Sequence, residues 1–136
     1  MDKILMIAGA SIFGLLGTMH LIYTFFTNKF EAFDPAVTEA MKGTSPILTK
    51  DTTLWNAWIG FNASHSLGAM LFAGIYIPLA LFNFNVIQQS IWFSTLSVIV
   101  GLSYLALAKK YWFKIPFVGI LISSIFFIAA AFLINL

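Results

Sequence analysis

Apolar residues dominate four long stretches of this chain, and polar residues collect in the short segments between them. The four stretches are Ile4–Phe26, Trp55–Phe82, Val86–Ala108 and Ile115–Leu136. Each is long enough, at about 1.5 Å per residue, to cross a hydrocarbon layer of about 30 Å as a helix. The alternation of period two that a membrane-spanning barrel requires is absent. The pattern therefore predicts an all-α polytopic membrane protein, a four-transmembrane-helix antiparallel bundle that forms a single domain over residues 1–136.

The connections between the stretches predict further elements. The second connection, Asn83–Asn85, is so short that the second and third spans should form an antiparallel hairpin. The first connection, residues 27–53, has room for a short helix, because Asp34 can act as its N-cap, Pro35 fits the first helical position and Gly43 can end it. Its apolar residues are expected on one face, with Thr38, Glu39 and Lys42 opposite: Ala36, Val37, Ala40 and Met41. This pattern predicts an interfacial helix in the first loop.

Composition and charge agree with a membrane protein and limit its function. Only 9% of the residues are charged, and 60% are hydrophobic. The absence of cysteine excludes disulfides, thiolate metal sites and thiol nucleophiles. The chain shows no basic surface of the kind that nucleic-acid binding requires, so we expect no nucleic-acid partner.

The distribution of lysine predicts an orientation in the membrane. Six of the seven lysines lie in the first and third loops: Lys29, Lys42, Lys50, Lys109, Lys110 and Lys114. Positive charge in short loops marks the cytoplasmic side of a membrane protein. Loops one and three are therefore predicted to be cytoplasmic, with both termini outside.

The stretch Trp55–Gly68, WNAWIGFNASHSLG, is unusually polar for a membrane span. On a helix, one continuous stripe is formed by Trp55, Trp58, Asn62, His65, Ala69, Phe72 and Tyr76. Lipid cannot hydrogen-bond to Asn or His, so this stripe is predicted to face protein or a cavity.

The other spans carry stripes that match it. The first span places on one face Phe13, Gly17, His20, Thr24 and Thr27. The third span has a stripe of small and polar residues, namely Ser90, Ser94, Ser97, Gly101 and Tyr104. Small residues at this spacing let helix backbones approach closely. Most of these positions are therefore predicted to serve helix packing.

The depths of four polar residues predict that they share one half of the membrane. Counted from the loop side at about 1.5 Å per residue, His20 lies roughly 10 Å deep, Asn62 roughly 12 Å, His65 roughly 16 Å and Tyr104 roughly 7 Å. Adjacent antiparallel helices would bring these side chains to similar levels.

Three interpretations of this cluster stay open. In the first, His20 and His65 are neutral structural groups that fix helix register through hydrogen bonds. In the second, the cluster lines a cavity for a small hydrophobic or lipid-like ligand, such as a quinone or a sterol, or meets a membrane partner. The predicted ligand-binding residues are His20, Thr24, Trp58, Asn62, His65 and Tyr104. In the third, His20 and His65 are the two axial ligands of haem b.

No catalytic residue is predicted. Ser64 and Ser66 adjoin His65 in the sequence but point elsewhere on a helix. No further metal site is predicted either, because the acidic residues of the first loop lack metal-ligand spacing. We therefore expect a protein that is not an enzyme and whose certain partner is the lipid bilayer.

Two motifs are similar to those of a known family. Gly17-Thr-Met-His20 in the first span and the stretch Trp55–Gly68 in the second resemble an uncharacterised family of small bacterial four-helix integral membrane proteins. The resemblance covers the first two spans and the loop between them. It implies a bacterial cytoplasmic (inner) membrane location and supplies no activity.

Overall fold

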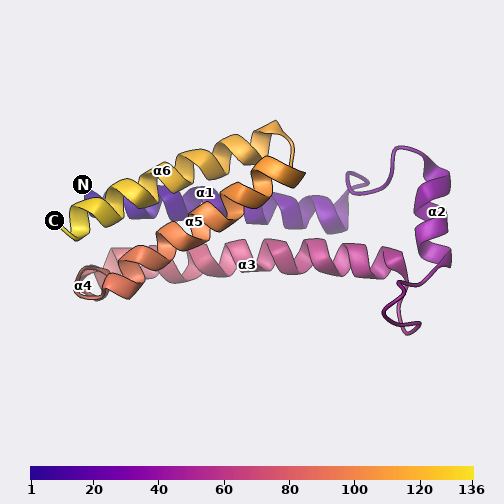
Figure 1. Ribbon diagram of the computed structural model, residues 1–136, viewed down its shortest axis with the longest axis horizontal. Helices are drawn as coiled ribbons and strands as arrows, with labels where there is room; N and C mark the ends of the chain where they lie inside the picture. Colours follow the sequence, from indigo (N-terminus) through magenta and orange to yellow (C-terminus); the bar gives the residue numbers. More distant parts are fainter. The chain divides into compact units, whose positions relative to one another are not determined.

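The computed structural model describes residues 1–136 and consists of six helices and their connections (Figure 1). In chain order these are α1 (Asp2–Phe26), α2 (Pro35–Gly43), α3 (Leu54–Phe82), α4 (Phe84–Gln89), α5 (Ile91–Tyr111) and α6 (Lys114–Ile134). The helices α1, α3, α5 and α6 are each long and apolar enough to cross a membrane. The predicted fold class is confirmed: the chain is an all-α, multi-pass membrane protein.

The connection between the second and third spans differs from the prediction. Residues expected to begin the third span form the separate helix α4, and α5 begins only at Ile91. Between them Ser90 has extended backbone, with φ −120° and ψ 109°. The interruption has a physical reason, because it lets Ile87 become fully buried while Gln88 stays exposed and reaches Asp2, 3.5 Å away.

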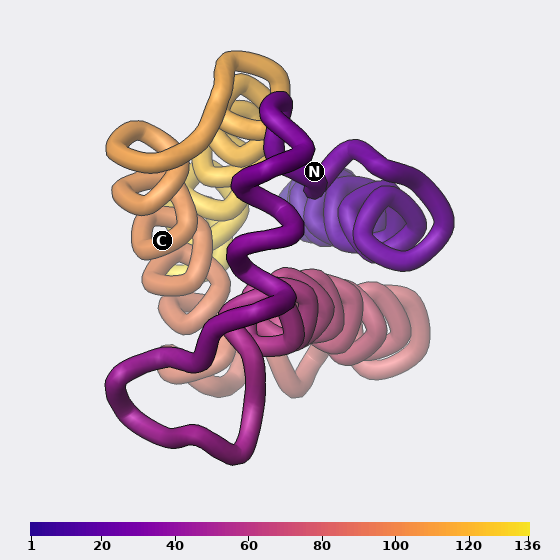
Figure 2. Tube along the Cα trace, turned by 90° about the vertical axis from the view of Figure 1, so that its right-hand side faces the viewer, coloured from indigo at the N-terminus to yellow at the C-terminus, as the bar shows by residue number.

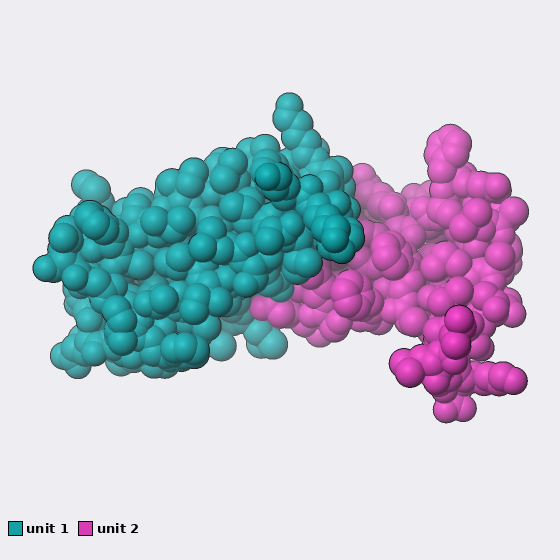
Figure 3. All heavy atoms as spheres, in the orientation of Figure 1, with its two compact units in different colours: residues 1–16, 69–136 teal, residues 17–68 magenta.

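The chain forms two compact units (Figure 3). The first unit comprises residues 1–16 and 69–136, and the second unit comprises residues 17–68. The long helices α1 and α3 are each divided between the two units, so that one part of each helix belongs to each unit.

The core of the first unit is organised around Phe13 of α1. Its ring lies 5.2 Å from the ring of Phe72 in α3, 5.2 Å from Tyr104 in α5 and 5.8 Å from Phe127 in α6, measured between centroids. Tilted and edge-on aromatic pairs at such distances are favourable beyond the area they bury. One fully buried side chain therefore joins all four long helices of this unit.

Small residues let the helices of the first unit approach closely. The stripe predicted on the third span faces the interior, since Ser94, Ser97 and Gly101 are all buried. On α6, the hydroxyl of Ser123 donates a hydrogen bond of 2.6 Å to the carbonyl oxygen of Gly9 in α1. The packing role predicted for the stripe of the third span is thus confirmed at Ser94, Ser97 and Gly101.

The second unit consists of the end of α1, the beginning of α3 and the loop that joins them. Here α2 lies across the ends of the two long segments, and the chain then makes a wide excursion before α3 begins (Figures 1 and 2). The predicted start of α2 is confirmed, because the Asp34 carboxylate accepts a hydrogen bond from the backbone N–H of Ala36 and Pro35 is the first helical residue. Gly43 is the last residue of α2.

The burial of α2 differs from the expected pattern. Thr38, expected on the polar face, is the buried residue, and its hydroxyl oxygen accepts a hydrogen bond from the backbone N–H of Ala32. The apolar Val37 is exposed. On the exposed side Lys42 donates to Glu39 over 2.8 Å, and this hydrogen bond raises the pKa of Lys42. The uncovered apolar residues suit a helix that rests on a membrane surface.

Candidate functional site

The second unit brings His20 of α1 and Asn62 of α3 into direct contact. The Nε2 atom of His20 lies 3.0 Å from Oδ1 of Asn62. The amide nitrogen of Asn62 donates to the carbonyl oxygen of Trp58, 2.8 Å away, one turn earlier in α3. Since Oδ1 can only accept, Nε2 of His20 carries the hydrogen, and in the neutral imidazole Nδ1 is then a hydrogen-bond acceptor. Asn62 is only 6% exposed, so this pair bridges the two helices in a low-dielectric setting.

His65 stands beside this pair. Its ring lies 5.4 Å from the ring of His20, centroid to centroid, in an edge-on arrangement with an interplanar angle of 67°. Both imidazoles are half-buried. The structure therefore places the chain's two histidines together, as the counted depths predict, with Asn62 next to them.

An aromatic wall closes one side of the His20 ring. Phe30, from the loop after α1, lies 4.6 Å from that ring and 6.3 Å from the ring of Trp58. The indole N–H of Trp58 donates to the carbonyl oxygen of Phe30, 3.0 Å away, which holds the loop against α3. Trp58 itself is 40% exposed.

Phe30 is the member of this site that the sequence analysis missed. It lies in the loop between Lys29 and Glu31, where no helical periodicity assigns it to a face. The only signal is an aromatic residue in a charged loop, four residues beyond the end of α1.

Two hydroxyl groups support the site from within their own helices. Thr24 is buried and donates to the carbonyl oxygen of His20, 2.8 Å away. Ser66, also buried, donates to the carbonyl oxygen of Asn62 over 2.9 Å. Such bonds satisfy a hydroxyl without a partner helix. Thr24 therefore belongs to the backbone support of His20, and its hydroxyl is already used.

Tyr104, the remaining residue predicted for the site, belongs to the first unit. Its ring packs edge-on against Phe13 and against Trp112, with centroids 5.2 Å and 6.1 Å apart. It is part of the aromatic packing around Phe13.

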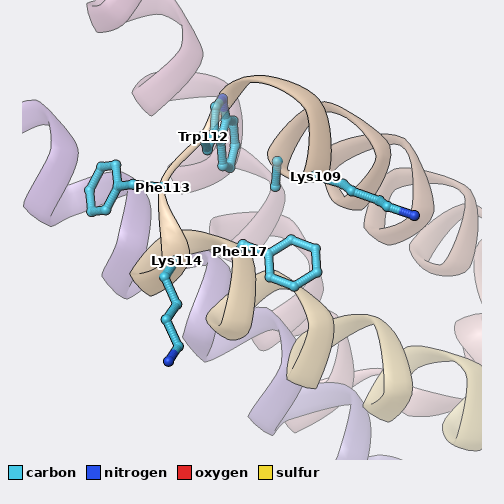
Figure 4. Close-up of a pocket in the computed structure, with 6 residues that line it drawn as sticks. Lys109, Trp112, Phe113, Lys114 and Phe117 are labelled. Carbon is cyan, nitrogen blue, oxygen red and sulfur yellow. The ribbon is translucent and has the colours of Figure 1, made fainter.

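A shallow pocket lies at the turn between α5 and α6, in the first unit (Figure 4). Its volume is about 270 Å³, and its lining consists of Ala108, Lys109, Trp112, Phe113, Lys114 and Phe117. None of the histidine-cluster residues belongs to it. No group of three or more His, Cys, Asp or Glu side chains is arranged to hold a metal ion.

Comparisons with protein-family models, with curated proteins and with solved structures give no match for this chain. The functional argument therefore depends on the geometry of the cluster. That geometry offers one acceptor nitrogen on His20, a second imidazole at ring-contact distance and an aromatic wall. Such a set can orient one polar group of an otherwise apolar molecule.

Proposed function

We propose that this chain is a small membrane protein that binds a hydrophobic, lipid-like molecule at the cluster of His20, Asn62 and His65. The ligand class is a molecule with a flat apolar body and one polar group, such as a quinone or a sterol. The observation that carries the proposal is the pair of half-buried imidazoles in ring contact next to Phe30 and the partly exposed Trp58.

The cost of polar groups in a membrane supports this proposal. An ionisable side chain within a span is expensive and marks a functional site unless its partners account for it. The hydrogen bond to Asn62 accounts for one nitrogen of His20. The cluster adds a second imidazole, His65, whose ring lies 5.4 Å from that of His20 and next to the aromatic wall. Two imidazoles in ring contact beside aromatic side chains support a site that positions one polar group.

The proposed membrane location depends on the sequence motifs and on the distribution of lysine. We propose a bacterial cytoplasmic membrane, on the strength of the resemblance carried by the His20 and Trp55–Gly68 motifs. Loops one and three are assigned to the cytoplasm because they hold six of the seven lysines. The histidine cluster would then open toward the cytoplasmic half of the bilayer.

The haem alternative requires a rearrangement of the cluster. Axial ligation uses one ring nitrogen of each histidine on opposite faces of a porphyrin. In the observed arrangement Nε2 of His20 is bound to Asn62, and the two rings meet edge to face. Haem binding would therefore have to separate the rings, and His20 would have to coordinate iron through Nδ1 or lose its hydrogen bond to Asn62.

The test of the proposal uses Trp58 as a reporter. A protein in which Trp55, Trp92 and Trp112 are replaced by Phe keeps Trp58 as its single tryptophan. It is reconstituted in vesicles and titrated with a short-tail benzoquinone and, separately, with a sterol analogue that quenches tryptophan. Saturable quenching by one of the two probes is the expected result. His20→Gln and His65→Gln should each weaken that binding about tenfold or more, because each removes an imidazole that positions the polar group.

Ser64→Ala is the matched control in the same helix. Its hydroxyl is exposed and donates only to the carbonyl oxygen of Phe61, so binding should not change. Linear, non-saturable quenching by both probes would contradict the proposal and leave the cluster with a structural role. Saturable binding that survives both histidine substitutions would place the ligand elsewhere.

A further inference from the structure

We infer that the histidine cluster selects a ligand whose polar group is a hydroxyl, and that Asn62 sets this selectivity through His20. The inference rests on the binding function proposed above and narrows its ligand class. The class becomes apolar alcohols with a flat ring body, such as a sterol or a quinol, and it leaves out ketones and oxidised quinones.

The hydrogen-bonding roles of the atoms between α3 and His20 determine one another in order. The carbonyl oxygen of Trp58 can only accept, so the group of Asn62 that lies 2.8 Å from it is the amide nitrogen. Oδ1 of Asn62 is thereby turned toward Nε2 of His20, 3.0 Å away. The reversed amide would place Oδ1 against the Trp58 carbonyl oxygen, with two acceptors in contact. Nε2 therefore carries the hydrogen, and the neutral ring presents a lone pair at Nδ1.

The Nδ1 atom of His20 is accessible to a ligand. The hydrogen bond to Asn62 is the only one that the His20 ring forms within the chain. No side-chain nitrogen or oxygen is both fully buried and without a hydrogen-bond partner. Nδ1 therefore reaches the surface of the half-buried cluster. An acceptor that lacks a partner in an apolar setting costs free energy, which the hydroxyl of a ligand would recover.

A hydroxyl suits this acceptor better than a carbonyl because it can donate. It donates to Nδ1 of His20 and keeps lone pairs for another donor. A ketone or quinone oxygen carries only lone pairs, so it would face the lone pair of Nδ1 with no hydrogen between them. The Phe30 ring, 4.6 Å from the His20 ring, offers the flat body of either ligand the same contact. The polar group therefore decides between them, since a site built for one hydrogen bond rejects an analogue that cannot form it.

Matched alcohol and ketone ligands measure this selectivity. Cholestanol and cholestanone share one skeleton and differ in a hydroxyl or a ketone at the same carbon. A short-tail hydroquinone, kept reduced with ascorbate, and its benzoquinone form the second pair. Isothermal titration calorimetry of the full chain in detergent, at about pH 8 where imidazole is neutral, gives each dissociation constant. We expect the alcohol of at least one pair to bind about tenfold or more tightly than its ketone, and that pair identifies the hydroxyl as that of a sterol or of a quinol.

Substitution of Asn62 tests its part in the selectivity. Asn62→Leu removes the acceptor that keeps the hydrogen on Nε2 of His20, so the ring can present either tautomer. The ratio of alcohol affinity to ketone affinity should then fall to about one. A purely structural loss would weaken both ligands equally and keep the ratio, which would contradict the role of Asn62. Ser64→Ala is the control and should keep the ratio, because its exposed hydroxyl bonds only the carbonyl oxygen of Phe61.

Nitrogen NMR of histidine-labelled protein tests the tautomer without a ligand. The chain contains two histidines, so His65→Gln assigns the signals of His20. We expect the hydrogen of neutral His20 on Nε2, and a hydrogen on Nδ1 would overturn the inference whatever the protein binds. Saturable binding in which neither alcohol exceeds its ketone would overturn the inference and leave the proposed function intact. Lack of saturable binding by all four compounds would overturn both.

Discussion

His20 and Asn62 form a side-chain hydrogen bond of 3.0 Å that ties α1 to α3 in the second unit. They are 42 residues apart in the sequence, and each also has a second attachment to its own helix. Asn62 donates to the carbonyl oxygen of Trp58, and the carbonyl oxygen of His20 accepts from Thr24. The pair therefore fixes both the level and the rotation at which the two helices meet.

This pair should show measurable energetic coupling. In a double-mutant cycle of His20→Phe and Asn62→Leu, we expect a coupling free energy of about 0.6 kcal/mol and at most about 1.7 kcal/mol, the values typical of hydrogen bonds between membrane helices. The measurement is the free energy of unfolding in mixed detergent micelles. Thr24→Val with Asn62→Leu is the control, since Thr24 bonds only its own helix, and it should give no coupling. Coupling of the same size in both cycles would show that the hydrogen bond is not the source.

The glycines offer a second prediction, on packing in the first unit. A Cβ atom added at Gly101 would come within 3.1 Å of the Phe127 ring and 3.4 Å of the Ser124 Cα atom. Gly101→Leu should therefore force α5 and α6 apart and destabilise the protein by about 1–3 kcal/mol. Gly74→Leu is the matched control in α3, where an added Cβ meets nothing within 4 Å. Thermal unfolding in detergent compares the two, and equal melting temperatures would contradict the close contact.

Much of the architecture could be predicted because a segment that crosses a membrane must satisfy its own backbone hydrogen bonds, which favours long apolar helices. The spans follow from length and polarity, and the small-residue stripe of α5 follows from helical spacing, since Ser94, Ser97 and Gly101 are all buried. The start of α2 was predictable because Asp34 and Pro35 are a local signal that needs no tertiary contact. These features depend on neighbours within one or two turns.

The features that sequence reasoning missed depend on tertiary contacts. The helix is interrupted at Ser90, and Ile87 before the interruption is fully buried. The periodicity of the sequence does not reveal this tertiary packing of Ile87. Thr38 is buried because the backbone N–H of Ala32, in a loop, needs an acceptor. Phe30 reaches His20 through a loop conformation that Trp58 stabilises. At the candidate site, the histidines and Asn62 were therefore predictable, whereas the aromatic wall was not.

The orientation of the chain gives a third prediction. A reporter enzyme fused after Leu136 should behave as extracytoplasmic, because six of the seven lysines lie in the loops that would then be inside. A reporter inserted after Gly43, at the end of α2, should behave as cytoplasmic. The two fusions are compared for alkaline phosphatase and fluorescent-protein activity in the same cells. A cytoplasmic C-terminus would reverse the orientation and move the histidine cluster to the outer half of the membrane.

The last prediction concerns haem. Since the two imidazoles meet edge to face with their centroids 5.4 Å apart, and no porphyrin fits between rings in contact, we expect protein purified from haem-replete cells to show no Soret band in proportion to its amount. The measurement is the visible spectrum before and after reduction with dithionite. A Soret band with narrow α and β bands in the reduced protein would contradict this expectation and favour a low-spin haem b with two histidine ligands. Two substitutions then identify the ligands: His20→Ala and His65→Ala should each abolish or convert the spectrum, because the chain contains no other histidine and no cysteine.

Asn62→Ala is the variant that separates haem from a quinone or sterol. It frees Nε2 of His20, so haem binding that competes with this hydrogen bond should become stronger in it, whereas a bound quinone or sterol should lose its fixed imidazole and bind more weakly.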